Sequence, residues 1–292
     1  WVKAGAVWPA EKANAATKKI FDLQKRKAEH WCWQPVKRPT VPTVQGTVRD
    51  PIDAFILAKL EEKGIKPAPP ASKSVWLRRV TFALTGLPPT PVELIAFEAD
   101  GKESAFETVV DRLLASPAYG ERWGRHWLDL VRYAESRGHE NDHTIPNAWI
   151  YRDYVVRAFN EDVSYRDFVS AQISGQTRPG NRYRNGTLTE ESIIGTAFWR
   201  LGEEVHSPVD IRQDQADRFD NRIDVFGKAI LGLTISCARC HDHKFDAIST
   251  KDYYSLFGLL QAGSDTPVRT EGMLNNAVVG AVRFKGRWAS EW

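Results

Sequence analysis

The chain is poor in the features that would assign it to several common classes of protein. Among its 292 residues are only 3 cysteines and 1 methionine, and its formal net charge is only +3. A positive charge this weak and dispersed gives no support to nucleic-acid binding. No apolar run approaches the length that spans a membrane. We therefore expect a globular chain without a nucleic-acid partner or a membrane span, long enough for one large domain or two small ones.

Alternation of apolar and polar residues, which is typical of strands, is also rare, whereas helix signals are frequent. Asp50-Pro51 and Thr90-Pro91 open helices, and Gly64 and Gly86 are typical of helix ends. The pattern predicts further helices over 105–115, 119–136, 147–160, 190–201 and 211–234 and after Ser249, with a long loop over 173–189. We predict a mainly α fold.

We divide the chain by composition into three parts. Residues 1–48 are expected to be the tail of a preceding domain plus an extended, proline-rich linker. Residues 49–265 form the predicted large helical domain, and residues 266–292 are a linker or the start of a following domain. The chain opens with Trp1 and shows no signal peptide, so we expect a processed or trimmed piece of a longer precursor.

The most specific motif is C-x-x-C-H at residues 237–241, between two predicted helices near the C-terminal end of the domain. It is the attachment signature of a c-type haem. The thiols of Cys237 and Cys240 can add across two vinyl groups of a porphyrin, and the imidazole of His241 then becomes the proximal ligand of the iron. We predict one covalent haem c. Thioether attachment takes place outside the cytoplasmic membrane, so we expect a periplasmic, cell-surface or extracellular protein.

Other uses of a C-x-x-C pair stay open: a redox dithiol, half of a zinc site, or a disulfide. A redox dithiol would call for a βαβ context, which the neighbouring sequence lacks. His241 and His243 could complete a zinc site, but no second C-x-x-C or paired-histidine motif follows. The third cysteine, Cys32, is expected to be a small buried hydrophobe.

Several long stretches resemble a known family. They are residues 50–57, 79–90, 113–123, 125–129, 132–134 and 237–246. In this order they resemble the second-type planctomycete cytochrome C domain of secreted planctomycete and verrucomicrobial proteins, over roughly residues 30–262. Residues 1–9 resemble the end of the first-type domain that often precedes it. The resemblance implies a secreted haem protein and implies little about a substrate.

The motif does not identify the ligand on the opposite face of the iron. His206, just before the helix that leads to the haem motif, is the first candidate, and His126 is the second. Each could instead be a hydrogen-bonded structural histidine. Met273 lies beyond the predicted domain, and His243 is too close to His241 to reach the opposite face.

Three other groups of charged residues are candidates for a functional role. Glu135, His139, Glu140, Asp142 and His143 could hold a divalent cation or contact a sugar, or could form a solvated polar loop. The aspartates between 210 and 224 recur at helical intervals with arginines, so we interpret them first as a salt-bridged helix face and second as a carboxylate site. Candidate partners for the haem propionates are Arg122, Arg125, Arg132 and Arg239.

Three functions are compatible with these residues. The first is one-electron transfer by a six-coordinate c-type haem, with a redox partner protein or adjacent domains of the precursor as partner. The second is a haem-dependent oxidoreductase acting on a carbohydrate or another extracellular substrate. The third is a scaffold whose 11 tryptophans hold carbohydrate or partner domains. We favour the first, because no nucleophile–base pair stands out.

Overall fold

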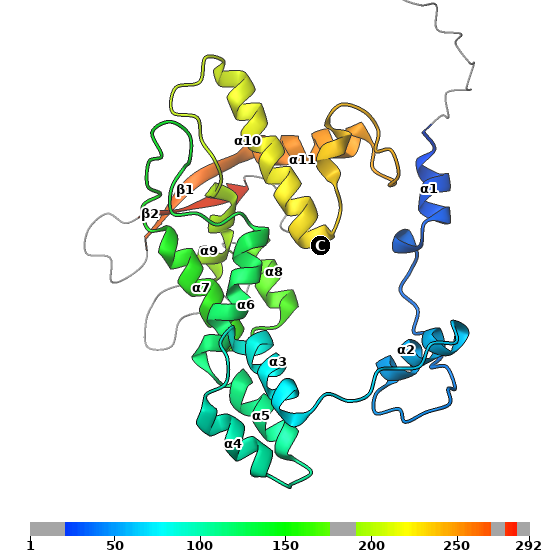
Figure 1. Cartoon of the computed structure of the whole chain (residues 1–292). Helices are drawn as coiled ribbons and strands as arrows, with labels where there is room; N and C mark the ends of the chain where they lie inside the picture. The colour runs from blue at the N-terminus through cyan, green and yellow to red at the C-terminus, as the bar shows by residue number, and fades with distance from the viewer. Residues whose placement is uncertain (1–20, 176–190, 270–277, 285–292) are drawn as a thin grey trace, which may run out of the picture.

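The computed structural model describes residues 21–175, 191–269 and 278–284. It is mainly helical, as predicted (Figure 1). The helices of the described ranges are α1 (Leu23–Glu29), α2 (Pro51–Glu62), α3 (Lys73–Thr85), α4 (Pro91–Ala99), α5 (Ala105–Leu114), α6 (Pro117–Leu130), α7 (Ala148–Asn160), α8 (Tyr165–Ser174), α9 (Glu191–Gly195), α10 (Ile211–Phe226) and α11 (Thr250–Ala262). Shorter turns are η2 (Trp31–Trp33), η3 (Thr196–Arg200), η4 (Gly227–Leu231) and η5 (Ile235–Arg239).

The helix ends follow the local sequence signals. The Asp50 carboxylate accepts a hydrogen bond from the Ile52 amide at 2.6 Å and so caps α2. α4 begins with a complete capping box, in which the side chains of Thr90 and Glu93 each accept a hydrogen bond from the other's backbone amide. Gly86 ends α3 in the left-handed region at φ 76°. These ends confirm the predicted boundaries.

Two predicted helices end earlier than the sequence suggested. The helix predicted over 119–136 ends at Leu130, because Arg132 adopts the left-handed conformation at φ 52°. The helix predicted over 211–234 is α-helical only to Phe226, and one π-helical turn carries it to Leu231. Gly232, at φ 66°, then reverses the chain toward η5.

The helices pack around two hydrophobic cores. A small core joins α3, α4 and α5 and contains Leu77, Phe97 and Leu113. A larger core joins the helices from α6 to α11, and its most buried members include Tyr151, Ile223, Ala238 and Tyr253. Figure 1 shows the two groups one above the other, with α6 between them. η5 contributes to the larger core, so the cysteine motif lies on a turn whose inner side is buried.

The N-terminal arm lies at one side of this body (Figure 1). Residues 35–50 contain no helix, as predicted for an extended linker. α1 nevertheless contacts the body, because the guanidinium of Arg26 donates to the backbone carbonyls of His243 and Asp246. The prediction that Cys32 is buried was wrong: Cys32 is exposed on η2, and its sulfur lies 2.9 Å from Nδ1 of His30. Its neighbour Trp33 on the same turn packs against the larger core.

After α11 the chain continues into strand β1 (Gly263–Arg269), which pairs in antiparallel register with β2 (Val278–Phe284). The pairing runs from Gly263 opposite Phe284 to Arg269 opposite Val278. The predicted boundary between residues 265 and 266 lies inside β1; the division of the chain into domains stays a prediction. No helix within the described ranges is both long and apolar enough to cross a bilayer.

Candidate functional site

The two cysteines of the motif lie on one side of η5, a 3-10 turn. Cys237 is inside η5 and Cys240 caps it. Side chains three positions apart in a 3-10 helix are eclipsed, so both thiols project in the same direction. Both are free and exposed, whereas Ile235 and Ala238, at 4% and 0% exposure, are packed in the core. The turn is therefore held from inside and presents both sulfurs to the outside.

The turn is fixed to α10 by charged contacts. The Arg239 guanidinium lies 2.8 Å from a carboxylate oxygen of Asp217 and 3.3 Å from one of Asp220. The Ser236 hydroxyl donates to Asp224 at 2.7 Å. The aspartates of α10 thus form the salt-bridged helix face that the sequence predicts. The guanidinium of Arg239 is thus engaged with two carboxylates of α10. That Arg239 binds a haem propionate stays a prediction.

Among the residues that the structure describes, His241 has one ring nitrogen engaged, and its other ring nitrogen has no hydrogen-bond partner. Its side chain is exposed, and Nδ1 lies 2.8 Å from the backbone carbonyl of Asp242. A carbonyl only accepts, so Nδ1 carries the proton and Nε2 carries the lone pair. The Asp242 carboxylate in turn accepts from the Thr250 amide at 2.8 Å, which fixes this residue at the start of α11. An imidazole so oriented is prepared to bind a metal through Nε2.

His243 has a different role, although it lies only two residues further on. It is buried at 4% exposure. Its Nδ1 accepts from the amides of Phe245 and Asp246 at 3.2 and 2.7 Å, so Nε2 carries the proton and donates to the Thr234 hydroxyl at 2.9 Å. His243 is therefore a structural residue that closes the loop after the motif. The sequence had excluded it as the distal ligand but did not indicate this role.

Two large exposed aromatic side chains follow the motif in the sequence. Phe245, four residues after His241, is 72% exposed, and Tyr254 on α11 is 52% exposed. The Tyr254 hydroxyl donates to the backbone carbonyl of Arg239 at 3.3 Å, which places its ring beside the turn. The exposed ring of Tyr254, beside the turn that carries the two free thiols, is apolar surface that a flat apolar ligand such as a porphyrin could contact.

The structure places the two candidate distal ligands on other elements. His206 is exposed in the loop before α10, and its Nδ1 lies 3.2 Å from Nε2 of His143. Iron binding by His206 would therefore use Nε2 or break this contact. His126 is exposed on α6, edge-on to the ring of Trp123. α6 packs against α3 and α7, whereas η5 packs against α10 and α11.

The arginines proposed for the propionates are also dispersed. Arg122 is half-buried on α6, and its side chain packs against Gly86, where a β-carbon would come within 3.1 Å of it. Arg125 is exposed on the same helix. Contacts of either residue with a haem stay predictions. Arg132 lies beyond the end of α6, in a polar cleft that the sequence did not indicate.

The charged residues between Glu135 and His143 contact different partners. Glu135 pairs with Arg152 at 2.8 Å, and Asp142 accepts from the Gly138 amide at 2.7 Å. His139 lies 3.2 Å from Glu203, on the loop that also carries His206. Within the described ranges, no three histidine, cysteine or carboxylate side chains are grouped as metal ligands. A divalent cation near Glu135, His139 and Asp142 stays a prediction.

A family model supplies the relationship of this chain to known proteins. Searches among curated proteins and among solved structures found no match. The model of the PSCyt2 family, described as "Protein of unknown function (DUF1549)", matches residues 51–264. This range runs from the first residue of α2 into β1 and includes the whole cysteine motif. Since it covers well over half of the chain, the protein belongs to the PSCyt2 family.

Proposed function

We propose that this protein is a secreted c-type haem protein that transfers single electrons. One haem is attached to Cys237 and Cys240, with His241 as the proximal ligand. The observation that carries the proposal is the geometry of η5: two free, exposed thiols on one side of a turn, followed at once by an exposed imidazole whose Nδ1 is engaged. Membership of PSCyt2 is in keeping with the resemblance to the second-type planctomycete cytochrome domains.

The residues around the motif fit the chemistry of this group. When bound, haem supplies an iron whose oxidation state changes by one electron. Cys237 and Cys240 hold the ring edge, and the Asp242 carbonyl keeps the proton on Nδ1 of His241. Phe245 and Tyr254 offer apolar surface. Both thiols are at the surface, so a haem held by them would be within reach of a partner protein or an adjacent domain for the exchange of electrons.

Attachment is tested by producing the chain in a host that matures c-type cytochromes. After denaturation and acid–acetone extraction, haem should stay on the polypeptide and raise its mass by one haem. The double variant Cys237→Ala/Cys240→Ala should carry none. Cys32→Ala is the matched control, because Cys32 is also free and exposed but lies outside the motif, and it should keep the haem. A colourless or fully extractable wild-type preparation would overturn the proposal.

The ligand set is tested by spectroscopy. We infer that His206 is the first candidate for the distal position, through Nε2, and His126 the second. His206→Ala should convert a low-spin spectrum into a high-spin one, and His143→Ala, which removes its neighbour, should leave the iron low-spin. An unchanged spectrum in His206→Ala would exclude His206 and direct the same test to His126.

The role is tested by carbon monoxide. Electron transfer by a six-coordinate haem predicts a reversible one-electron potential and no rapid binding of carbon monoxide by the reduced protein. Rapid binding, together with turnover of an extracellular substrate that is lost on mutating His139 or Asp142, would favour the haem-dependent oxidoreductase instead.

A further inference from the structure

Two histidines from distant parts of the sequence face each other at the surface. Nε2 of His143 lies 3.2 Å from Nδ1 of His206, and the centres of the two rings are 5.0 Å apart. Both side chains are exposed. Two neutral imidazoles at this distance share one proton, so one facing nitrogen donates and the other accepts. If that proton moves to the other nitrogen of its own ring, both facing nitrogens hold a lone pair and both rings stay neutral.

His143 lies on a turn, residues 136–144, whose backbone is fixed by its own hydrogen bonds. The Arg137 amide donates to the His143 carbonyl at 2.8 Å. Ser136 and Thr144, at the two ends of the turn, form an antiparallel bridge. The position of the His143 backbone is therefore set by the fold and does not depend on what its side chain contacts.

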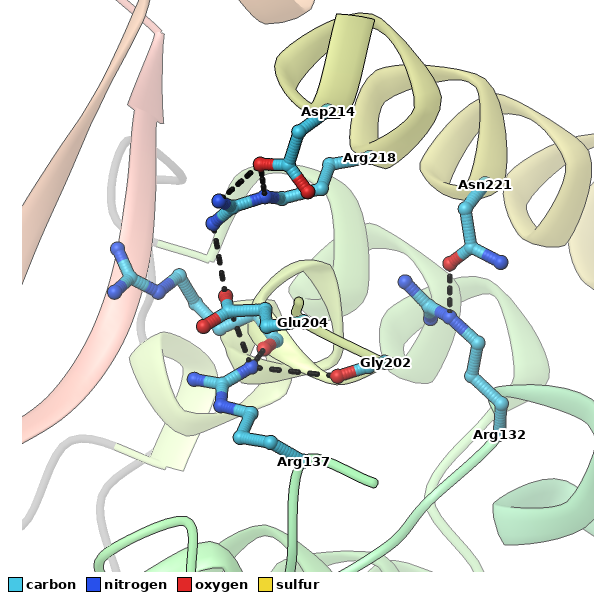
Figure 2. A network of polar contacts seen from close by, with 8 residues as sticks. Arg132, Arg137, Gly202, Glu204, Asp214, Arg218 and Asn221 are labelled. Carbon is cyan, nitrogen blue, oxygen red and sulfur yellow. Dashed lines mark hydrogen bonds and ion pairs between the residues drawn. The ribbon is translucent and has the colours of Figure 1, made fainter. Parts of the chain in front are cut away.

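The loop that carries His206 is attached to this turn by Arg137. As Figure 2 shows, the Arg137 guanidinium donates to the Gly202 carbonyl at 3.5 Å and lies 3.2 Å from the Glu204 carboxylate. It also donates to the Arg200 carbonyl at 2.7 Å. The Glu204 amide donates in return to the Arg137 carbonyl at 3.2 Å. These contacts bring the two segments together independently of the histidines, so the pair is held in place before any ligand binds.

The separation of the two nitrogens is also that of two ligands on one metal ion. A bond between zinc and an imidazole nitrogen is about 2.0–2.1 Å long, and two such bonds at an angle between a right angle and the tetrahedral angle place the nitrogens about 2.9–3.4 Å apart. The observed 3.2 Å lies inside this range. Because both rings are exposed, each can rotate to direct its lone pair at a shared ion.

We propose that His143 and His206 form a two-histidine site for a divalent late transition metal ion such as Zn²⁺ or Ni²⁺. Imidazole nitrogens suit these ions, whereas Mg²⁺ and Ca²⁺ prefer oxygen ligands. Within the described ranges, no third histidine, cysteine or carboxylate joins the pair, so water or a donor atom of a solute takes the remaining positions. The site is distinct from the cation predicted near Glu135, His139 and Asp142, because those side chains contact other partners.

This inference goes beyond the proposed electron transfer and does not rest on haem. A neutral imidazole has one lone pair, so His206 can serve the ion through Nδ1 or an iron through Nε2, and not both at once. An ion at the pair therefore leaves His126 as the distal candidate. The site is tested in the full-length chain without cysteines, Cys32→Ala/Cys237→Ala/Cys240→Ala, because free thiols bind the same ions.

The test is calorimetric titration of this cysteine-free protein with Zn²⁺ and Ni²⁺, and with Mg²⁺ and Ca²⁺ as ions that should not bind. We expect saturable binding of one Zn²⁺ or Ni²⁺ per chain near neutral pH. His143→Ala and His206→Ala should each weaken binding about tenfold or more. His139→Ala is the matched control, because His139 is an exposed histidine of the same turn, and it should bind within about twofold of the cysteine-free protein.

Melting temperatures give a second readout. An ion held by residues 143 and 206 links two distant segments of the folded chain, so Zn²⁺ should raise the melting temperature of the cysteine-free protein and of His139→Ala, but not of His143→Ala or His206→Ala. Melting without the ion checks that each variant is folded, and His143→Gln and His206→Gln repeat the titration should an alanine variant be unstable. The inference is overturned if neither Zn²⁺ nor Ni²⁺ binds saturably, if His143→Ala or His206→Ala binds as tightly as the cysteine-free protein, or if His139→Ala weakens binding as much as they do.

Discussion

Replacing either of two histidines that lie two residues apart by alanine should have very different effects on the stability of the fold. His243 is buried and uses both ring nitrogens, whereas His241 is exposed and, within the described ranges, hydrogen-bonds through its side chain only to the neighbouring carbonyl. His243→Ala removes the acceptor for the amides of Phe245 and Asp246 and the donor to Thr234. It also leaves a small void. We expect His243→Ala to destabilise the fold strongly and His241→Ala to leave its stability almost unchanged.

The magnitude follows from the number of groups left without partners. A buried donor or acceptor that loses its partner costs about 1–3 kcal/mol. Phe245 is exposed and Asp246 is half-buried, so water can reach their amides and the lower end of that range applies to each. With the Thr234 contact and the void, we expect a loss of about 2–4 kcal/mol in the free energy of unfolding for His243→Ala. His241→Ala should cost less than about 0.5 kcal/mol.

The assay is urea unfolding followed by circular dichroism, with both substitutions made in the Cys237→Ala/Cys240→Ala background so that haem does not contribute to stability. In thermal unfolding the His243→Ala loss corresponds to a fall of roughly 4–16 °C in melting temperature. His243→Gln should recover part of it, because an amide can both accept and donate. Equal stability of the two alanine variants would refute the structural role of His243.

Three further predictions concern the attachment of the turn and the N-terminal arm. Hydrogen bonds from Gln213 and then Arg239 lower the pKa of Asp217 below its ordinary value of 3.8. The charged Asp217 side chain therefore contributes its full stabilisation above pH 3.8, and this contribution is lost as the pH falls through the lower pKa of the folded state. Asp217→Asn should lower the free energy of unfolding by less than about 1 kcal/mol near neutral pH. At the acid end of a series of urea unfolding curves, the substitution should have no measurable effect. Tyr253→Phe removes the 2.6 Å hydrogen bond to Asp220 and should lower the unfolding free energy by about 1.5–3 kcal/mol by the same assay, and an unchanged value would contradict that contact. Cys32, being exposed, should react rapidly with a thiol reagent in the folded, haem-loaded protein, and a reaction seen only after denaturation would show that it is covered.

Local signals in the sequence were sufficient for most of the secondary structure. Capping residues act within one helical turn, so Thr90 with Glu93 and Gly86 could be interpreted without knowledge of any distant contact. The same holds for the cysteine motif, whose spacing of three positions itself places both thiols on one side of a turn. The helix end at Leu130 could not be predicted, because nothing local indicates that Arg132 adopts a conformation normally taken by glycine.

The sequence alone therefore determined a mainly helical chain, with the C-x-x-C-H motif between two helices near its C-terminal end, because helix periodicity, caps and motif spacing are properties of neighbouring residues. Only the tertiary structure decided which side chains meet across the chain. It buried His243 and exposed His241, and it attached Arg239 to α10. It also gathered Arg132 and Arg222 from distant segments into one cleft. Such contacts depend on how helices pack, and packing is set by the whole core and not by adjacent residues.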